Sequence, residues 1–436
     1  MGWDMLLPLL VANALTAEPS IPFTKYELPN GLDVTLSPDH SVPFVCVNVW
    51  SDVGSKDEIA GRSGFAHLFE HLMFNGSKHA DEDFFKPLQK LGARLNGSTN
   101  LDRTNYYECL PSEQLPRAVF LEADRMGWLL EALTLEKLVN QKDVVRNERR
   151  QNYDNPPYGH SWLELLKNVF PAGHPYHIAT IGKHEEIDAA ELEDVKAFFR
   201  KWYLPNNASL VLTGDFDDAV ARELVERYFG PVARGPQPEH IRPAPVVLTE
   251  EKRVVVSDKV PFEKVWVVWP TPAVLEPGDA DLDLLASALS AGKESRLYTA
   301  LVHDLQLAQD VSAYQGSQAW QSLFIISATA SEGHTGAELV TAIDAVLAAT
   351  AKSGITQREV EVGRTAFEVG FFENLATIQG KADLLNSYNV RTGDPGYLGK
   401  DLARYKVATT ETVAAALTTW LPPDKRLVLT FVPEVK

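Results

Sequence analysis

The sequence predicts an α+β fold of two related domains, each a mostly antiparallel sheet with helices on one face. Three observations support this prediction. Strand-like and helical stretches alternate, tight turns connect neighbouring strands, and the second half of the chain repeats the order of elements in the first. The chain has 436 residues, which is long for one hydrophobic core and suits two domains of about 200 residues each.

Turns, caps and apolar runs predict the elements of the first half. The Asn-Gly turn at 30–31 predicts a hairpin over 26–37, because this dipeptide favours the tight turn between antiparallel strands. Thr134 can cap a helix that Pro156 ends. The other expected elements are a strand over 42–50, helices around 65–74, 81–91 and 111–130, and a hairpin over 92–110.

An internal repeat links the two halves. Residues 260–269 begin with Val-Pro-Phe and end in tryptophan, as residues 42–50 do, and an expected helix at about 280–301 follows them. A helical stretch, a proline-containing turn and a strand recur at 189–215 and at 401–432. Two strands could share Val-Pro-Phe by chance, but the matching order of elements favours a duplication.

Residues 231–246 carry five prolines and are the best candidate for a linker between the domains. This assignment gives a first domain over 18–230 and a second, related domain over 247–436. The second domain contains no H-x-x-E-H sequence, so we expect it to be free of metal.

Residues 1–17 read as a signal peptide for export, because residues 6–14 are apolar and small residues precede Glu18. The stretch departs from the usual pattern in having Asp4 and no lysine or arginine. We therefore expect the periplasm or another exported compartment, with the cytoplasm as the alternative.

Composition excludes some classes of function. The net charge of −18 disfavours nucleic acid as a partner, and no apolar run after the start is long enough for a transmembrane segment in the mature chain. The two cysteines, Cys46 and Cys109, are too few for a disulfide scaffold or a cysteine zinc site. Both lie in strand-like stretches, and we expect two buried free thiols rather than a bridge.

The sequence His-Leu-Phe-Glu-His at 67–71 carries the strongest functional signal. On a helix, His67, Glu70 and His71 share one face, because they are i, i+3 and i+4. Two imidazoles one turn apart can bind a single Zn²⁺ at about 2.0–2.1 Å, with Glu70 beside the open coordination position. A carboxylate there can take the proton of a water that the metal activates. The order H-x-x-E-H inverts the commoner zinc-peptidase motif.

A five-residue pattern has a simpler explanation than a zinc site, namely a buried helix whose two histidines are hydrogen-bonded within the fold. The stretch is otherwise apolar, and burying three ionisable groups in it costs free energy unless something pairs them. Glu148, on the helix expected after Thr134, is a candidate third ligand. A glutamate on a helix is ordinary by itself, so its assignment depends on a family resemblance.

The chain resembles the inverted-motif zinc peptidases, the family of pitrilysin, insulin-degrading enzyme and mitochondrial processing peptidase. The resemblance covers nearly all of residues 20–436. Besides the H-x-x-E-H motif, matching signatures occur in family order at 29–32, 96–99, 104–107, 147–148, 174–176, 181–182, 203–207, 214–216 and 295–297.

This resemblance implies a zinc-dependent metalloendopeptidase. His67, His71 and Glu148 would bind one Zn²⁺ per chain, and Glu70 would be the general base on the water that zinc activates. Three protein ligands leave the metal open for catalysis.

The resemblance also implies how the peptide substrate binds. The substrate would pair by its main chain with an edge strand at Asn96 and Gly97. Extended or unfolded peptides should then be better substrates than folded proteins.

Two departures from the family pattern bear on the site. Gln141 stands where the family commonly has a glutamate, seven residues before Glu148, and it would support the ligands without adding charge. Family members hold the substrate carbonyl with an arginine–tyrosine pair from the opposite half, and the expected strand 323–329 has neither residue. Full-length members have four such domains, which form a clamshell. This chain has two such domains, which correspond to half of a clamshell. We therefore expect a homodimer, or a heterodimer with a related chain that supplies the pair.

Two other functions compete with the peptidase. The first is a non-catalytic scaffold subunit of the same fold in a peptidase or membrane complex; loss of His67, Glu70 or His71 would mark it, and none is lost. The second is a closed structural zinc site, which needs a fourth protein ligand, and no candidate lies close in sequence.

Overall fold

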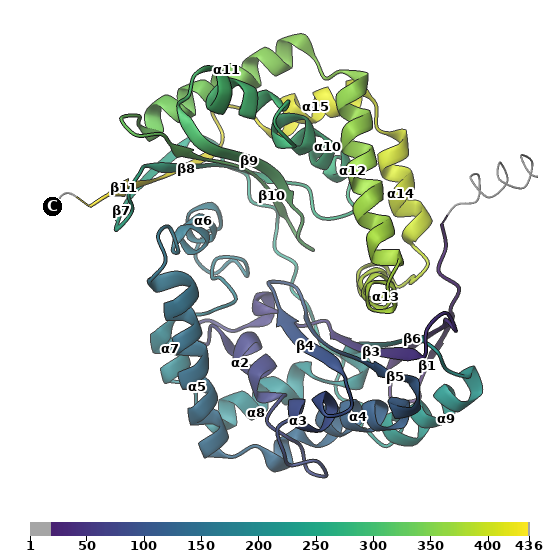
Figure 1. Ribbon diagram of the computed structural model, residues 1–436. Coiled ribbons are helices and arrows are strands. Elements are labelled where there is room, and N and C mark those ends of the chain that lie inside the picture. Colours follow the sequence, from purple (N-terminus) through teal and green to yellow (C-terminus); the bar gives the residue numbers. More distant parts are fainter. Residues whose placement is uncertain (1–18, 435–436) are drawn as a thin grey trace, which may run out of the picture.

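The computed structural model describes residues 19–434 and contains two sheets, one in each half of the chain, whose inner faces look toward each other (Figure 1). The leader predicted over 1–17 lies outside the described residues. Between Gly230 and Glu251 the chain forms neither helix nor strand, and this segment connects the two halves.

The first sheet has six strands in the order β1-β2-β6-β3-β5-β4. Its pairs are antiparallel except β2 with β6, which is parallel. The strands are β1 Thr24–Glu27, β2 Asp33–Pro38, β3 Phe44–Ser51, β4 Arg94–Thr99, β5 Thr104–Pro111 and β6 Ala208–Gly214.

The second sheet repeats this topology with five strands in the order β7-β11-β8-β10-β9. Again one pair, β7 with β11, is parallel and the rest are antiparallel. The strands are β7 Lys252–Asp258, β8 Lys264–Thr271, β9 Ala308–Gly316, β10 Ser322–Ala330 and β11 Leu427–Pro433. The predicted fold of two related, mostly antiparallel α+β domains is therefore confirmed.

Helices cover the outer face of each sheet (Figure 1). The helices of the first half are α2 Phe65–Leu72, α3 Phe85–Gln89, α4 Leu115–Ala132, α5 Leu135–Arg149, α6 Ser161–Val169, α7 His184–Asp188, α8 Leu192–Trp202 and α9 Asp218–Phe229. The helices of the second half are α10 Asp279–Ser290, α11 Gly336–Ser353, α12 Gln357–Leu375, α13 Ile378–Thr392, α14 Leu398–Val407 and α15 Thr410–Trp420.

Each half also lends one helix to the inner face of the other half's sheet (Figure 1). Helix α6 packs on β11, where Leu166 joins a core cluster with Leu429 and Phe431. Helix α13 packs on β3 and β6, and there Asn386 donates to the backbone oxygen of Asn48 at 2.9 Å. This exchange fixes the two halves against each other.

The expectation of two free cysteines is wrong, because Cys46 and Cys109 form a disulfide. They are directly opposite each other in the antiparallel register of β3 and β5, with their Cα atoms 4.1 Å apart. Their distance depends on the register of two strands that are far apart in the chain, which the sequence does not specify.

Two expected helices are shorter in the structure. The one expected over 81–91 is only α3, because the Asp83 side chain accepts from the backbone N–H of Phe85 at 2.8 Å and starts the helix there. The one expected over about 280–301 is α10, which ends at Ser290, and a separate π-helical turn follows at Tyr298–Asp304.

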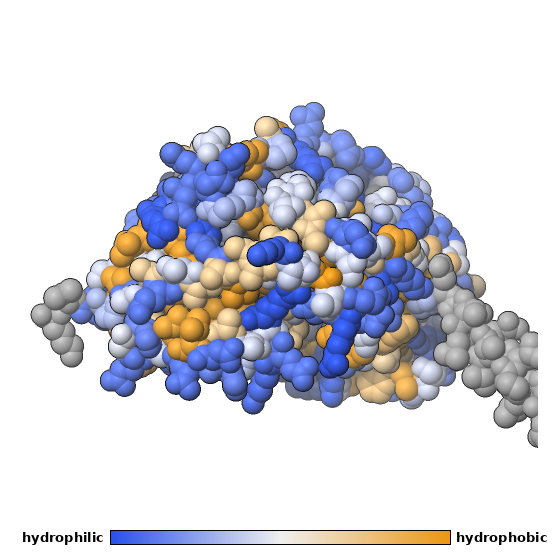
Figure 2. Space-filling model, turned by 90° about the horizontal axis from the view of Figure 1, so that it is seen from above, coloured by the Kyte–Doolittle hydropathy of each residue, from blue (hydrophilic) through white to orange (hydrophobic). Residues whose placement is uncertain are grey.

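The surface of the second half, seen from the side of its helices, shows short bands of apolar side chains between hydrophilic ones (Figure 2). Among residues 19–434, no single helix has the length and apolar character to cross a membrane. Helices α11 and α12 pass that test only together, across a bend of 111°.

A buried ionisable cluster lies between β5 and α4. Arg125 donates to Glu122 and lies over the rings of Tyr106 and Phe84, each 4.2 Å from the guanidinium carbon. Glu108 is fully buried beside this pair, and burial, followed by repulsion from Glu122, raises its pKa well above the ordinary value. The fold therefore favours the protonated form of Glu108.

This cluster predicts a pH-dependent stability. The raised pKa means that the folded chain holds a proton on Glu108 that the unfolded chain releases, so stability falls as the pH rises toward the folded pKa. Glu108→Gln should remove that loss and raise the Tm at pH 8 by a few degrees, since about 1 kcal/mol moves the Tm of a domain of this size by roughly 2–4 °C. Thermal unfolding of both proteins from pH 5 to 9 tests this. The exposed Glu113→Gln is the control, and a constant difference between parent and E108Q would contradict the assignment.

Candidate metal centre

Helix α2 carries three of the predicted site residues: His67, Glu70 and His71. Its other face is apolar and buried in the core, which fixes the rotation of the helix. Phe69 on that face stacks on Tyr203, with ring centroids 4.9 Å apart. The polar face is thereby left toward α5.

The start of α2 is held by a residue that sequence reasoning missed. Gly64 at the N-cap has no side chain to accept from the first turn, and Glu58 does so instead. The Glu58 carboxylate accepts from the N–H of Gly64 at 3.0 Å and of Ala66 at 2.9 Å. Burial raises the pKa of Glu58 to about 8, although these two hydrogen bonds lower it. The glycine at the N-cap, which has no side-chain acceptor, was the only signal in the sequence that another group must cap the helix.

Helix α5 brings Glu148 to α2. As expected, Thr134 caps this helix, and its hydroxyl accepts from the N–H of Lys137 at 3.2 Å. Helix α5 packs against α2, which places Glu148 near its C-terminal end opposite the two imidazoles.

The two imidazoles and this carboxylate form a compact triangle. Nε2 of His67 and Nε2 of His71 lie 3.3 Å apart, and Oε2 of Glu148 lies 3.6 Å and 3.3 Å from them respectively. Ligands held tetrahedrally about 2.0–2.1 Å from one zinc ion lie about 3.3–3.4 Å apart, so these three atoms fit the ion. Within residues 19–434, these three side chains form the one group of metal-ligating residues close enough to hold a metal ion. No fourth ligating side chain belongs to this group.

The electrostatics suit a cation. Burial, with repulsion from His71, lowers the pKa of His67 to about 4, so its imidazole is neutral and able to ligate. A hydrogen bond with His71 lowers the pKa of Glu148, which is therefore ionised. Nδ1 of His67 is buried without a hydrogen-bond partner among the described residues, so no second group fixes this ring.

Glu70 lies on the same face of α2 but outside the triangle. Burial raises its pKa above the ordinary value, while a hydrogen bond from Thr99 and the charge of His71 oppose this. A carboxylate whose pKa is raised toward neutrality is matched to accepting a proton from water and releasing it again.

Strand β4, beside α2, is a free edge of the first sheet. Asn96 lies on this strand, and its side chain accepts from the N–H of Gly97 at 2.9 Å. A Cβ atom on Gly97 would lie 3.0 Å from Tyr106 and 3.1 Å from Phe74, so packing beneath the strand favours glycine there. The unpaired edge next to the triangle is where an extended chain could add to the sheet.

Gln141 lies two turns before Glu148 on α5 and does not contact the triangle directly. Its amide donates to Asn75 at 3.3 Å, and Asn75 donates to the backbone oxygen of His71 at 2.9 Å. Gln141 therefore acts on the C-terminal end of α2 rather than on a ligand atom.

A cavity of about 460 Å³ lies between the halves, lined by Trp50 and Arg103 from the first and Arg391 from the second. Arg103 was also missed by sequence reasoning. It donates to the backbone oxygen of Ser98 on β4 at 2.8 Å and lies 4.9 Å from the ring of Trp50. Its place in a turn sequence gave no sign that it braces the edge strand.

Comparison with known proteins identifies a family for the chain. Residues 33–182 match the model described as insulinase, peptidase family M16, and residues 189–367 match the model described as peptidase M16 inactive domain. The zinc protease PqqE of Helicobacter pylori is 29% identical over 407 residues, covering 91% of this chain and 90% of that protein.

Solved structures agree. The crystal structure of a protease from Helicobacter pylori superposes with a TM-score of 0.88 at 26% identity, covering 95% of this chain and 100% of that one. The periplasmic protease PqqL from Escherichia coli has the same fold, with a TM-score of 0.75 at 16% identity, and this chain covers 48% of it. The chain belongs to the insulinase family, peptidase family M16, as a member of its short bacterial type.

Proposed function

We propose that this chain is a zinc-dependent metalloendopeptidase that cleaves extended or unfolded peptides. The observation that carries the proposal is the triangle of His67, His71 and Glu148, whose sides match the ligand spacing of one tetrahedral zinc ion. The names of relatives as zinc proteases support the same activity.

Each residue has one role in this proposal. His67, His71 and Glu148 hold one zinc ion per chain, which when bound supplies a Lewis acid for the peptide carbonyl and for water. Glu70 accepts the proton of the attacking water and passes it to the leaving nitrogen. Gln141 supports the end of α2 through Asn75.

The substrate adds to the free edge of β4 in this proposal. Its main chain pairs with the strand at Asn96 and Gly97, which places a peptide bond beside α2. The Asn96 side chain now occupies the outward N–H of Gly97 and must turn away when substrate pairs. A folded protein cannot offer a strand to this edge, so unfolded chains are the preferred substrates.

A second chain completes the enzyme. This chain spans about half of PqqL, and its own second half has no metal-ligating triangle among the described residues. We infer a homodimer, or a heterodimer with a related chain, in which the partner supplies an arginine–tyrosine pair to the substrate.

An exported compartment fits the disulfide between Cys46 and Cys109, because such bonds persist in oxidising compartments and are rare in the cytosol. The likeness to the periplasmic protease PqqL points in the same direction.

The first prediction from this proposal tests the general base. Glu70→Gln should retain zinc and lower the turnover of an unfolded fluorogenic peptide by about 10²–10⁴-fold, because proton transfer to a positioned side chain contributes that much. Measuring kcat and bound zinc on the same samples separates base loss from metal loss. Zinc-loaded parent protein without turnover would favour the non-catalytic scaffold, and full turnover in E70Q would exclude this base.

A second prediction concerns the ligands. His67→Ala and Glu148→Gln should each lower the zinc content, measured by atomic absorption after dialysis, by at least about tenfold at limiting zinc, since each removes one of three protein ligands. Glu136→Gln, an exposed glutamate on the same helix α5, is the matched control and should keep one zinc per chain. Equal zinc in E148Q and E136Q would remove Glu148 from the centre.

A third prediction concerns assembly. The purified chain should run as a dimer in light scattering at micromolar concentration, and its specific activity should rise with concentration, because each active chamber needs two chains. If the chain needs a related partner instead, adding that chain should restore activity. A monomer with full, concentration-independent activity would contradict the proposal.

A further inference from the structure

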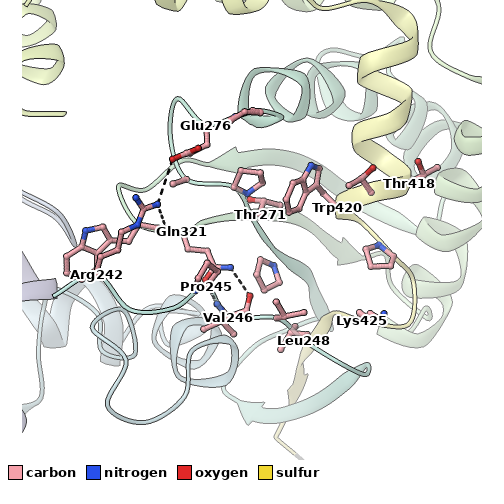
Figure 3. Close-up of a pocket in the computed structure, with 18 residues that line it drawn as sticks. Arg242, Pro245, Val246, Leu248, Thr271, Glu276, Gln321, Thr418, Trp420 and Lys425 are labelled. Atoms are coloured by element: carbon pink, nitrogen blue, oxygen red, sulfur yellow. Dashed lines mark hydrogen bonds and ion pairs between the residues drawn. The ribbon is translucent and has the colours of Figure 1, made fainter. Parts of the chain in front are cut away.

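A groove separate from the metal centre lies against the sheet of the second half. The residues that line it are far from the metal-binding residues in the sequence. Its volume is about 770 Å³, and its lining includes Trp420, Pro272 and Pro422 together with Val247 and Leu248 of the connecting segment (Figure 3). Figure 3 shows Trp420 and Leu248 on opposite sides of this space. The lining is mainly aromatic, proline and aliphatic, which is unusual for a surface that water reaches.

Because the fold is duplicated, we take the surface beside Trp202 as the equivalent of this groove in the first half and call it the first groove. The same spacing in sequence that separates Val42 from Val260 also separates Trp202 from Trp420. Both tryptophans end a helix, α8 and α15, and a proline-containing turn and a central strand follow each. The two grooves are therefore copies of one structural feature.

In the first half this groove is filled by the chain itself. The segment 235–240, which reads Gly-Pro-Gln-Pro-Glu-His, runs across it without helix or strand. The His240 ring lies 5.1 Å from the Trp202 ring, centroid to centroid. Asn206 binds the segment by its main chain: its Oδ1 accepts from the N–H of Gly235 at 3.0 Å, and its Nδ2 donates to the oxygen of Pro236 at 3.2 Å.

The polar residues at the two grooves differ, and this defines the ligand. In the first groove Asp57 holds Nδ1 of His240 at 2.9 Å, and Asp52 lies 3.4 Å from its Nε2. Pro270 follows Asp52 by the same number of residues as Trp420 follows Trp202, so a proline takes the place of this aspartate in the second groove. An occupant of the second groove should therefore have an apolar residue where the linker has histidine.

We propose that the groove at Trp420 is a docking site for an extended, proline-rich segment of a partner protein, with an apolar residue seated on the tryptophan. Proline-rich segments favour the polyproline II helix, which docks on aromatic-lined grooves with little loss of entropy. The occupied first groove supplies the precedent within this chain. This proposal does not rest on the metal centre.

The test is a titration of the full-length chain, in the Glu70→Gln background so that no probe is cleaved. The probe is a synthetic decapeptide, Ala-Pro-Leu-Pro-Ala-Pro-Leu-Pro-Ala-Pro, and its partner replaces every proline with serine. Binding is followed by calorimetry and by tryptophan fluorescence. The proline peptide should bind and the serine peptide should not, because only the first is preorganised.

Two variants locate the binding. Trp420→Ala should weaken binding by at least about tenfold, as expected for loss of a tryptophan anchor. Val247→Glu places a charge on an exposed wall residue and should weaken binding without affecting the fold. Val255→Glu, equally exposed but on β7 outside the groove, is the matched control.

Other outcomes would overturn the proposal. Binding that W420A and V247E leave unchanged would place the peptide elsewhere, for example in the chamber at Trp50. No binding of the proline peptide at millimolar concentration would exclude a docking site for such segments. Self-association that V247E abolishes, without peptide binding, would mean that a second copy of this chain covers the groove.

Discussion

The proposed metal centre depends on one constraint: a carboxylate on α5 must reach two imidazoles on α2 to within the ligand spacing of a single ion. Helix α2 has only eight residues, too few to be stable alone, so its position is set by packing. Phe69 fixes its rotation against Tyr203, and Glu58 fixes its start. A shift of α2 by even one ångström would separate the imidazoles from Glu148, which is why so much of the first half packs on this short helix.

The same helix joins the metal centre to the edge of the sheet. Because α2 packs beside β4, an extended chain that pairs with this edge lies next to the triangle without any further positioning device. The opposite wall of the chamber comes from the second half, and the exchanged helices α6 and α13 hold that wall in place. The contact of Asn386 with Asn48 is buried and polar, and such contacts specify one register of packing more strictly than apolar ones do.

Local chemistry was predictable from the sequence, and tertiary register was not. The spacing of His67, Glu70 and His71 placed them on one helix face, and Thr134 capped its helix as expected. The repeat of Val-Pro-Phe predicted two related domains, and the structure contains two sheets of matching topology. The pairing of Cys46 with Cys109 depends on how two distant strands align, and Glu58 reaches its helix from a loop. No local pattern records either contact, and Glu148 was assigned only through the family resemblance.

The duplication also explains why the two halves differ where they do. In the first half the loop before α2 is charged, and Asp57 holds His240 of the connecting segment over Trp202. In the second half the matching loop contains prolines, and the groove at Trp420 is open to solvent. An exposed apolar groove lowers solubility, and its retention beside a polar rim is the pattern expected of a surface that another molecule covers.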